Sequence, residues 1–329
     1  MILAGDIGGT STRLAFFEVS AGRLRAAAET IYPSAQFSGL APIALAFVET
    51  AKLPVAQACF GIAGPIRGGR VETPNLPWVI EAGELGQALG LERALLINDL
   101  EANAYGIDTL GPEDFRTIQA GAPGAAGNAA VVSAGTGLGE AGLYWDGTRH
   151  QPFACEGGHT DFGPRDDLQG ELLVYLRAKY DGRVSYERIV SGPGLLNIYE
   201  FLRDSGRGPE TPAVAAQMRA DDPSSVISQF ALRGECPLCL QALEVFVSIY
   251  GAEAGNAALK FMATGGLYIG GGIAPKIIDK LAGPLFVDAF NAKGRMRPLL
   301  ESIPVRVILN PMTALLGAAR YAALQSGLM

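Results

Sequence analysis

The sequence predicts an α/β fold with two domains, and three observations support this. The chain has 329 residues, a length that favours two domains over one. Short apolar runs that end in glycine alternate with segments whose apolar residues recur at helical spacing, as in a sheet covered by helices on both faces. A pattern of strand, Gly/Thr turn and strand occurs twice, near 2–19 and 129–144, which indicates a weak internal duplication.

The apolar runs predict the following elements in chain order. Strands are expected at 2–6, 13–19, 55–60, 94–97, 129–133, 141–144, 267–269 and 305–309. Helices are expected from 100 onward, at 168–180, at 238–260, after Pro275 and at 312–324.

Composition and charge exclude several classes of protein. Apolar residues make up 49% and charged residues 18% of the chain, which is typical of a folded protein and not of a disordered one. The net charge of −7 argues against nucleic acid or an anionic membrane as a partner. We expect no membrane helix and no signal peptide, because no apolar run reaches the length of a span and no basic leader precedes the first strand. Four cysteines in so long a chain favour a reducing cytoplasm.

The first glycine turn carries a phosphate-binding pattern. Gly8 and Gly9 let backbone N–H groups point into a concave turn, and Thr10 adds a hydroxyl donor. Asp6, at the end of the preceding strand, can hold Mg²⁺ through water. The turn is neither a Walker loop nor a Rossmann turn, since no Lys-Ser/Thr and no helix follows it. A plain hairpin turn is the alternative interpretation.

Two further glycine turns follow later in the chain. Gly135, Thr136 and Gly137 repeat the first arrangement, and a pair of such turns can clamp a polyphosphate. The run Gly270–Gly272 lies at a strand-to-helix junction, where a backbone can approach a nucleotide base or ribose. Structural turns and close helix–strand packing remain open for each of them.

Asn98 and Asp99 end a buried strand, where open α/β sheets place their working residues. A carboxylate there can accept the proton of a substrate hydroxyl that attacks phosphorus. A helix N-cap is the alternative, because both residue types are good caps.

Glu156 and His159 flank two glycines, so both side chains can turn toward one point. A carboxylate and an imidazole suit the hydroxyl groups of a sugar, and Glu187 is a further hydroxyl acceptor. A structural histidine and an ordinary surface charge are the alternatives. Cys236 and Cys239 have CxxC spacing, but no second pair of zinc ligands accompanies them, so helix packing is favoured over metal or redox chemistry.

Six segments together resemble the bacterial glucokinase family, of the hexokinase and actin-like ATPase superfamily, over nearly the whole chain and in family order. The segments are Gly5–Thr10, Ile97–Ala102, Gly135–Gly139, Glu156–His159, Ser191–Gly194 and Gly270–Ile273. The resemblance implies a two-domain actin-like ATPase (ribonuclease H-like) fold with the active site in the interdomain cleft. The implied small α/β domain spans 1–109 plus 306–329, and the large α+β domain spans 110–305.

The resemblance also implies an activity, ATP-dependent phosphorylation of D-glucose to glucose 6-phosphate, as in glycolysis, with Asp99 as the general base. The implied glucose contacts are Asn98, Asp99, Glu156, His159 and Glu187. The implied phosphate-binding residues are Gly8, Gly9, Thr10, Gly135, Thr136 and Gly137. Asp6 would serve Mg²⁺, Gly270, Gly271 and Gly272 would lie near the adenosine of ATP, and a homodimer is the common default.

Three other functions remain as alternatives. The first is a kinase of another hexose or a glucokinase that uses polyphosphate. The second is a sugar-sensing repressor, which should carry a basic DNA-binding segment ahead of the first strand; because the first expected strand begins at residue 2, this alternative is disfavoured. The third is an ATPase of the actin or heat-shock type, against which the expected hydroxyl-binding residues Asn98, Asp99, Glu156 and His159 argue. A related family of sugar kinases and repressors has a zinc-binding cysteine cluster after its Glu-Gly-Gly-His segment, but here Thr160–Pro164 follows, so no structural zinc is expected.

Overall fold

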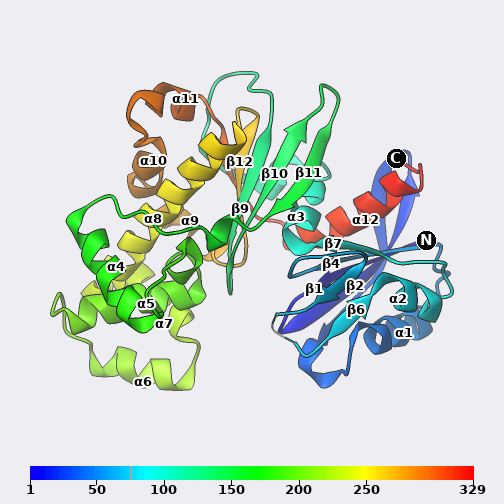
Figure 1. The fold of residues 1–329 in the computed structure, drawn as a ribbon, viewed down its shortest axis with the longest axis horizontal. Helices are drawn as coiled ribbons and strands as arrows, with labels where there is room; N and C mark the ends of the chain where they lie inside the picture. The colour runs from blue at the N-terminus through cyan, green and yellow to red at the C-terminus, as the bar shows by residue number, and fades with distance from the viewer. Residues whose placement is uncertain (75) are drawn as a thin grey trace. The chain divides into compact units, whose positions relative to one another are not determined.

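The structure is a computed structural model that describes residues 1–74 and 76–329, and it divides into two compact units (Figure 1). Unit 1 comprises Met1–Asp114, Gln151–Ala154 and Asn310–Met329, and unit 2 comprises Phe115–His150 and Cys155–Leu309.

Unit 1 is built on a five-stranded sheet in the order β3-β2-β1-β4-β7. β2 runs antiparallel to β1 and β3, whereas β4 runs parallel to β1 and β7. Unit 1 also contains a separate antiparallel pair of strands, β5 and β6. The elements are β1 (Ile2–Ile7), β2 (Ser11–Ser20), β3 (Arg23–Pro33), α1 (Leu40–Ala51), β4 (Gln57–Ile62), β5 (Arg70–Glu72), β6 (Val79–Glu81), α2 (Ala82–Ala88), β7 (Leu95–Asn98), α3 (Asp99–Ile107) and α12 (Thr313–Gln325).

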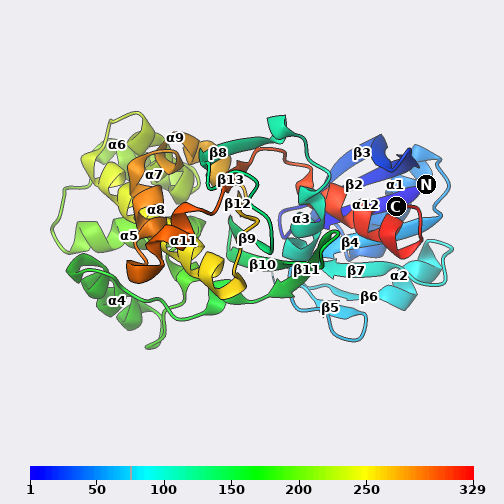
Figure 2. The same cartoon turned by 90° about the horizontal axis from the view of Figure 1, so that it is seen from above.

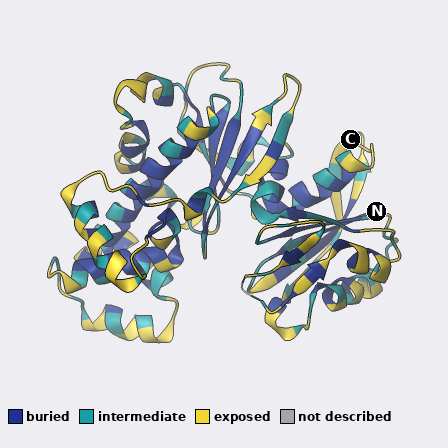
Figure 3. Ribbon diagram, viewed as in Figure 1, coloured by how far each residue is buried: buried dark blue, intermediate teal, exposed yellow. Residues whose placement is uncertain are grey.

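Alternation along the strands gives this sheet two buried faces. Leu3 and Phe60 belong to a core with α1, whereas Ile2, Ala4 and Cys59 belong to a second core with α12. The residues of both cores are buried, and the central strands of the sheet are therefore dark blue in Figure 3. The near-continuous apolar character of β1 and β4 follows from this two-sided burial.

Helices α3 and α12 cross in direct backbone contact. A Cβ at Gly317 of α12 would lie 1.7 Å from the carbonyl oxygen of Ala102, and a Cβ at Gly106 of α3 would lie 2.0 Å from the carbonyl oxygen of Thr313. Only glycine permits this approach, and α3 is therefore held firmly on the sheet.

We expect Gly317→Ala to destabilise the protein by about 1–3 kcal/mol, because the added methyl forces α12 off α3. Gly83→Ala is the matched control, since Gly83 is also helical, in α2, and has no atom within 4 Å of a new Cβ. The control should be neutral or slightly stabilising. Thermal and denaturant unfolding of both variants measures the difference, and equal midpoints would contradict the packing described.

Unit 2 combines a six-stranded sheet with a set of helices. The strand order is β11-β10-β9-β12-β13-β8, which can be followed in Figure 2. The elements are β8 (Phe115–Gln119), β9 (Ala129–Ala134), β10 (Leu138–Trp145), α4 (Asp167–Lys179), α5 (Gly192–Asp204), α6 (Pro212–Ala220), α7 (Pro223–Leu232), α8 (Pro237–Phe261), β12 (Gly266–Gly270), α9 (Ile278–Leu281), α10 (Pro284–Asn291), α11 (Arg297–Glu301) and β13 (Val305–Ile308). The remaining strand of this sheet, β11 (His150–Cys155), has only its two terminal residues in unit 2, because Gln151–Ala154 are assigned to unit 1.

Helix α8 forms the core of unit 2. It is long and apolar enough to cross a membrane, but most of its most apolar stretch is buried inside the protein. It packs against α5, α7 and α10. At its start, Cys236 is the N-cap, and its Sγ accepts a hydrogen bond from the N–H of Cys239 at 3.2 Å. Both cysteines are buried, so the helix-packing interpretation of the CxxC segment is confirmed.

The expected strands and long helices are present, with two instructive details. The pairing of the first unit recurs in the second: β10-β9-β12 repeats the directions of β2-β1-β4, an antiparallel hairpin whose first strand has a parallel neighbour. This supports the predicted duplication. After Pro275, however, the chain makes a 3₁₀ turn and then only the short α9, where the sequence predicts a helix.

Candidate active site

The carboxyl ends of β1, β4 and β7 carry the polar groups of unit 1. Asp6 of β1 is aligned with Gly61 of β4. A Cβ at Gly61 would lie 2.8 Å from the Cβ of Ala102 and 3.8 Å from the Cα of Asp99. Glycine at position 61 therefore lets α3 begin close against the sheet, and Asp6 and Asp99 are both neighbours of this one glycine.

Asn98 and Asp99 have different local roles. Asn98 is the N-cap of α3, with its Oδ1 accepting from the N–H groups of Leu100 (2.9 Å) and Glu101 (3.4 Å). Asp99 is the first helical residue, is half-buried, and accepts from the N–H of Leu100 at 3.0 Å. The N-cap alternative is correct for Asn98, whereas Asp99 lies where the helix dipole favours a carboxylate. Contact of either residue with a sugar stays a prediction.

Asp6 lies near the carboxyl end of β1, where two opposing effects act on its pKa. Burial raises its pKa, and the charge of Arg13, its partner across the β1–β2 ladder, acts in the opposite direction. Arg13 is held by the carbonyl of Pro311 at 3.1 Å and by Glu29 at 3.5 Å. Among the described residues no group of three or more His, Cys, Asp or Glu side chains gathers as a metal cage. A lone carboxylate suits Mg²⁺, which takes most of its ligands from water and phosphate.

The turn from Gly8 to Thr10 is braced by Ser34. The hydroxyl of Ser34 donates to the carbonyl of Gly8 at 2.8 Å, and its N–H donates to the carbonyl of Thr10 at 3.1 Å. A further hydrogen bond of 3.0 Å joins the hydroxyls of Ser34 and Thr12, both of which are buried. The hydrogen bonds from Ser34 therefore fix the turn, and Thr10 remains exposed.

In unit 2 the backbone of Leu138 joins two groups of predicted site residues. Leu138 follows the Gly135–Gly137 turn as the first residue of β10. Its N–H donates to Oε2 of Glu187 at 3.1 Å, and a Cβ at Gly158 would lie 2.0 Å from its carbonyl oxygen. The expected phosphate turn and the expected sugar acceptors are therefore neighbours at one strand end.

The segment Glu156–His159, which we call the acceptor turn, lies directly on β10. A Cβ at Gly157 would lie 1.9 Å from Oε2 of Glu140, and Gly158 is just as close to Leu138. Two consecutive glycines are required because any side chain at either position would lift the turn from the strand. Arg183 adds support by donating to the carbonyl oxygen of His159 and pairing with Asp161 at 2.9 Å.

The acceptor turn brings three predicted residues together. Nε2 of His159 lies 3.9 Å from Oε2 of Glu156, and its Nδ1 lies 3.8 Å from Oε1 of Glu187. These separations exceed a hydrogen bond, so the nitrogen and oxygen atoms are available to hydroxyl groups. The side chains of Glu156 and His159 are 59% and 56% exposed.

The Gly270–Gly272 turn lies against the residue before the Gly135–Gly137 turn. Gly271 has a φ of +84°, and a Cβ there would lie 2.2 Å from the carbonyl oxygen of Ala134. The N–H of Ile273 donates to the same carbonyl at 3.3 Å. The structure thus brings two of the three predicted glycine turns together, whereas the third belongs to unit 1.

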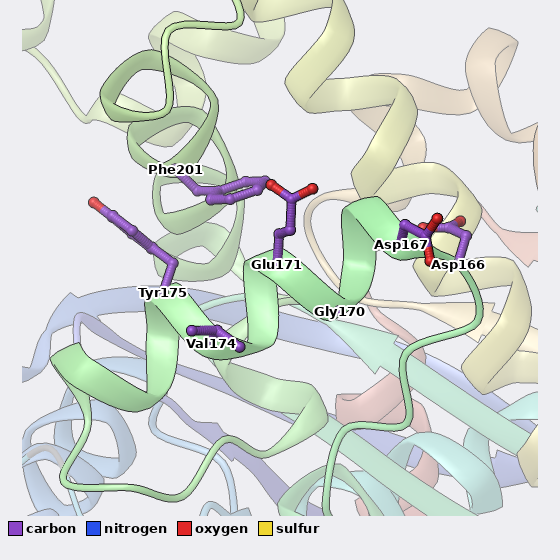
Figure 4. A pocket seen from close by; sticks show the side chains of 7 residues that line it. All are labelled: Asp166, Asp167, Gly170, Glu171, Val174, Tyr175 and Phe201. Atoms are coloured by element: carbon purple, nitrogen blue, oxygen red, sulfur yellow. The ribbon is translucent and has the colours of Figure 1, made fainter.

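A hollow of about 250 Å³ lies beside the residues predicted to bind the sugar. It is lined by His159, Lys179, Tyr180, Asp181, Arg183, Ser185, Glu187 and Arg188. A larger hollow of about 580 Å³, between α4 and α5, is shown in Figure 4 and contains none of the predicted site residues. It is lined by Asp166, Asp167, Gly170, Glu171, Val174, Tyr175 and Phe201. The smaller hollow is the candidate sugar site of unit 2, because its wall includes His159 and Glu187, two of the residues predicted to bind sugar hydroxyls.

The site has four supporting residues that were not predicted from the sequence: Ser34, Gly61, Glu140 and Arg183. The role of Gly61 could have been predicted, because a glycine at the end of an apolar strand indicates that another backbone approaches closely there. The other three act through contacts with residues distant in the chain, which no local pattern displays.

The two sheets, their glycine turns and the carboxylates beside them define a sugar kinase with the actin-like ATPase fold. The chain belongs to the glucokinase family, whose model, described as Glucokinase, matches residues 3–325. A glucokinase of Trichormus variabilis is 44% identical, covering 98% of this chain and 99% of that protein. The crystal structure of a glucokinase from an Antarctic psychrotroph is 32% identical, covers 98% of both chains and has a TM-score of 0.82.

A more distant solved structure shares the fold. The ROK family glucokinase from Streptomyces griseus, in complex with glucose and AMPPNP, is 23% identical. It covers 98% of this chain and 99% of its own, with a TM-score of 0.64.

Proposed function

We propose that this protein transfers the γ-phosphoryl group of ATP to the 6-hydroxyl of D-glucose, with Asp99 as the general base. The observation that carries the proposal is the placement of Asp99 and Asp6 around Gly61 at the strand ends of a glucokinase-family chain. A base and a phosphate-side carboxylate are the two acidic groups that phosphoryl transfer to an alcohol requires.

The chemical step follows from the position of Asp99. Its carboxylate accepts the proton of the sugar hydroxyl as the hydroxyl oxygen forms its bond to phosphorus, and the bond from phosphorus to the ADP oxygen breaks. The products are glucose 6-phosphate, ADP and a protonated Asp99 that returns its proton to solvent. Most of the rate enhancement comes from holding the hydroxyl in line with the phosphoryl group.

The glycine turns bind the phosphates through backbone N–H groups in this proposal. Gly8, Gly9 and Thr10 serve from unit 1, and Gly135, Thr136 and Gly137 serve from unit 2. Asp6 would hold Mg²⁺ through water, and the ion would supply positive charge that offsets the charge of the phosphates. Gly270, Gly271 and Gly272 approach the adenosine, which their contact with Ala134 beside the phosphate turn supports.

The acceptor turn determines which sugar is bound. Glu156, His159 and Glu187 hydrogen-bond the hydroxyls of glucose, and Asn98 contributes through its side-chain amide. Once a bound sugar covers them, these polar groups disfavour a sugar that leaves them unpaired, so epimers of glucose should be poor substrates. We further propose a cytoplasmic homodimer, with the four free cysteines suited to a reducing compartment.

A coupled assay with purified protein, Mg-ATP and a panel of sugars tests the function. We expect glucose to be phosphorylated at least about tenfold more efficiently than mannose, fructose or N-acetylglucosamine, the scale of one lost polar contact. Chelation of Mg²⁺ should abolish turnover, and polyphosphate should not replace ATP. Equal rates with all four sugars would rule out a strict glucokinase, and ATP hydrolysis without any sugar would favour an ATPase of the actin type.

A further inference from the structure

Glu140 is a buried carboxyl directly beneath the acceptor turn. It belongs to β10 and is 1% exposed. Neither of its carboxyl oxygens forms a hydrogen bond with any of the described residues. Its Oε2 fills the space that a side chain at Gly157 would need, at 1.9 Å from an ideal Cβ. The backbone of the acceptor turn therefore rests on this carboxyl, which neither the phosphoryl transfer nor the sugar contacts use.

A second buried carboxyl, Glu253 of α8, faces Glu140. Glu253 is fully buried, and its oxygens accept from Lys260 at 3.3 Å and from Asn256 at 2.8 Å. Glu253 thus has a cation and an amide as partners, whereas Glu140 has neither. Two buried carboxylates repel one another, so the proton of the pair belongs to Glu140. Burial and then the charge of Glu253 raise the pKa of Glu140 to about 8, against an opposing effect of Lys260.

Other titratable groups surround the pair. Burial raises the pKa of Cys155, whose Sγ donates to the carbonyl of Glu140 at 3.4 Å. Burial and Glu253 raise the pKa of Tyr186 to about 12. Burial lowers the pKa of Lys293 to about 8, with Arg165 also acting on it and Glu253 opposing. Lys293 is a second group that titrates near the pH range of Glu140, so the test must separate the two.

We propose that Glu140 is a positioning residue for sugar binding: its uncharged carboxyl lies beside Glu253 without adding a second charge and supports Gly157, which keeps Glu156 and His159 directed toward Glu187. This inference rests on the proposed binding of glucose by the acceptor turn. Ionisation of Glu140 places two like charges in a buried site, where they separate or draw in water, and the backbone above them moves.

The expected consequence is a loss of glucose affinity above pH 8 without a loss of turnover. If only the uncharged form of Glu140 is competent, the apparent Kd rises by the inverse of its remaining fraction, about tenfold from pH 7 to pH 9. Saturating glucose selects the competent form, so kcat should change less than about twofold over the same range. A split between KM and kcat distinguishes this role from general destabilisation.

The experiment measures glucose binding by calorimetry at pH 7 and pH 9, together with KM and kcat, for the wild type and Glu140→Gln. Glutamine keeps the shape and the donor but cannot ionise, so its glucose affinity should change less than about twofold between the two pH values. Glu18→Gln is the control, because it removes the same charge from an exposed position on β2 and should keep the wild-type pH dependence.

Two results would overturn the inference. One is a wild-type affinity that is equal at pH 7 and pH 9, which needs no variant to fold. The other is a Glu140→Gln variant that retains the wild-type decline, which would assign the effect to Lys293 or another group. Turnover of glucose by the wild type at pH 7 reports on the proposed function separately, so the two failures are distinguishable.

Discussion

Asp99→Asn is expected to lose at least about a hundredfold in kcat, the usual contribution of a general base, while KM for glucose changes only a few-fold. Asparagine retains an oxygen that accepts from the N–H of Leu100, so the start of α3 should keep its geometry. The variant removes the ability to accept the proton of the 6-hydroxyl. Steady-state kinetics with glucose and Mg-ATP measures the effect.

Asp167→Asn is the matched control for this prediction. Asp167 is the first residue of α4 and follows a capping Asp166, just as Asp99 is the first residue of α3 and follows a capping Asn98. Neutralising either carboxylate costs a favourable interaction with a helix dipole of about 0.3–1 kcal/mol. Near-normal turnover of the Asp99 variant, or an equal loss in the control, would refute Asp99 as the base.

Gly158→Ala is expected to reduce kcat/KM for glucose by about a hundredfold, the effect of moving binding groups by roughly 1 Å. The new methyl would meet the carbonyl oxygen of Leu138 at 2.0 Å, and this backbone atom cannot move without shifting the start of β10. The acceptor turn must therefore rise from the strand, which carries Glu156 and His159 away from Glu187. Glucose titrations and kinetics measure the loss.

Gly170→Ala provides the comparison in the same unit. Gly170 lies within α4, and a Cβ there has no neighbour within 4 Å. Its replacement should leave the kinetics unchanged and favour the helix by up to about 1 kcal/mol. If Gly158→Ala also retains wild-type kinetics, the acceptor turn does not hold the sugar.

Local patterns in the sequence were sufficient for the elements that position the site. Three of these features were predicted: the β1–β2 hairpin, the strand that ends at Asn98 and the Gly135–Gly137 turn. Each is identified by residues that are adjacent in the sequence, either the glycines of a turn or the polar residues at a strand end. After Pro275, where a helix was expected, a 3₁₀ turn leads into the short α9, since a proline marks where a helix can begin but not how far tertiary packing lets it extend.

The supports of the site could not be predicted in the same way. Ser34 reaches Gly8 from the 3₁₀ turn that follows β3, and Glu140 meets Gly157 and Glu253 only after β10, the acceptor turn and α8 have come together. In the sequence, Glu140 is one acidic residue in an apolar strand, and burial is what gives it an unusual charge state. Such properties belong to tertiary contacts and not to any local pattern.

The placement of α12 has a consequence for how the nascent chain matures. This helix covers the sheet face that contains Ile2, Ala4 and Cys59, yet the ribosome releases Thr313–Gln325 only after all of unit 2. Unit 2 can complete its own core during synthesis. The face of β1 and β4 that α12 covers stays exposed to solvent until α12 has been synthesised. Uncovered apolar strands are prone to aggregate, so the interval before α12 emerges is when a chaperone would matter most to this protein.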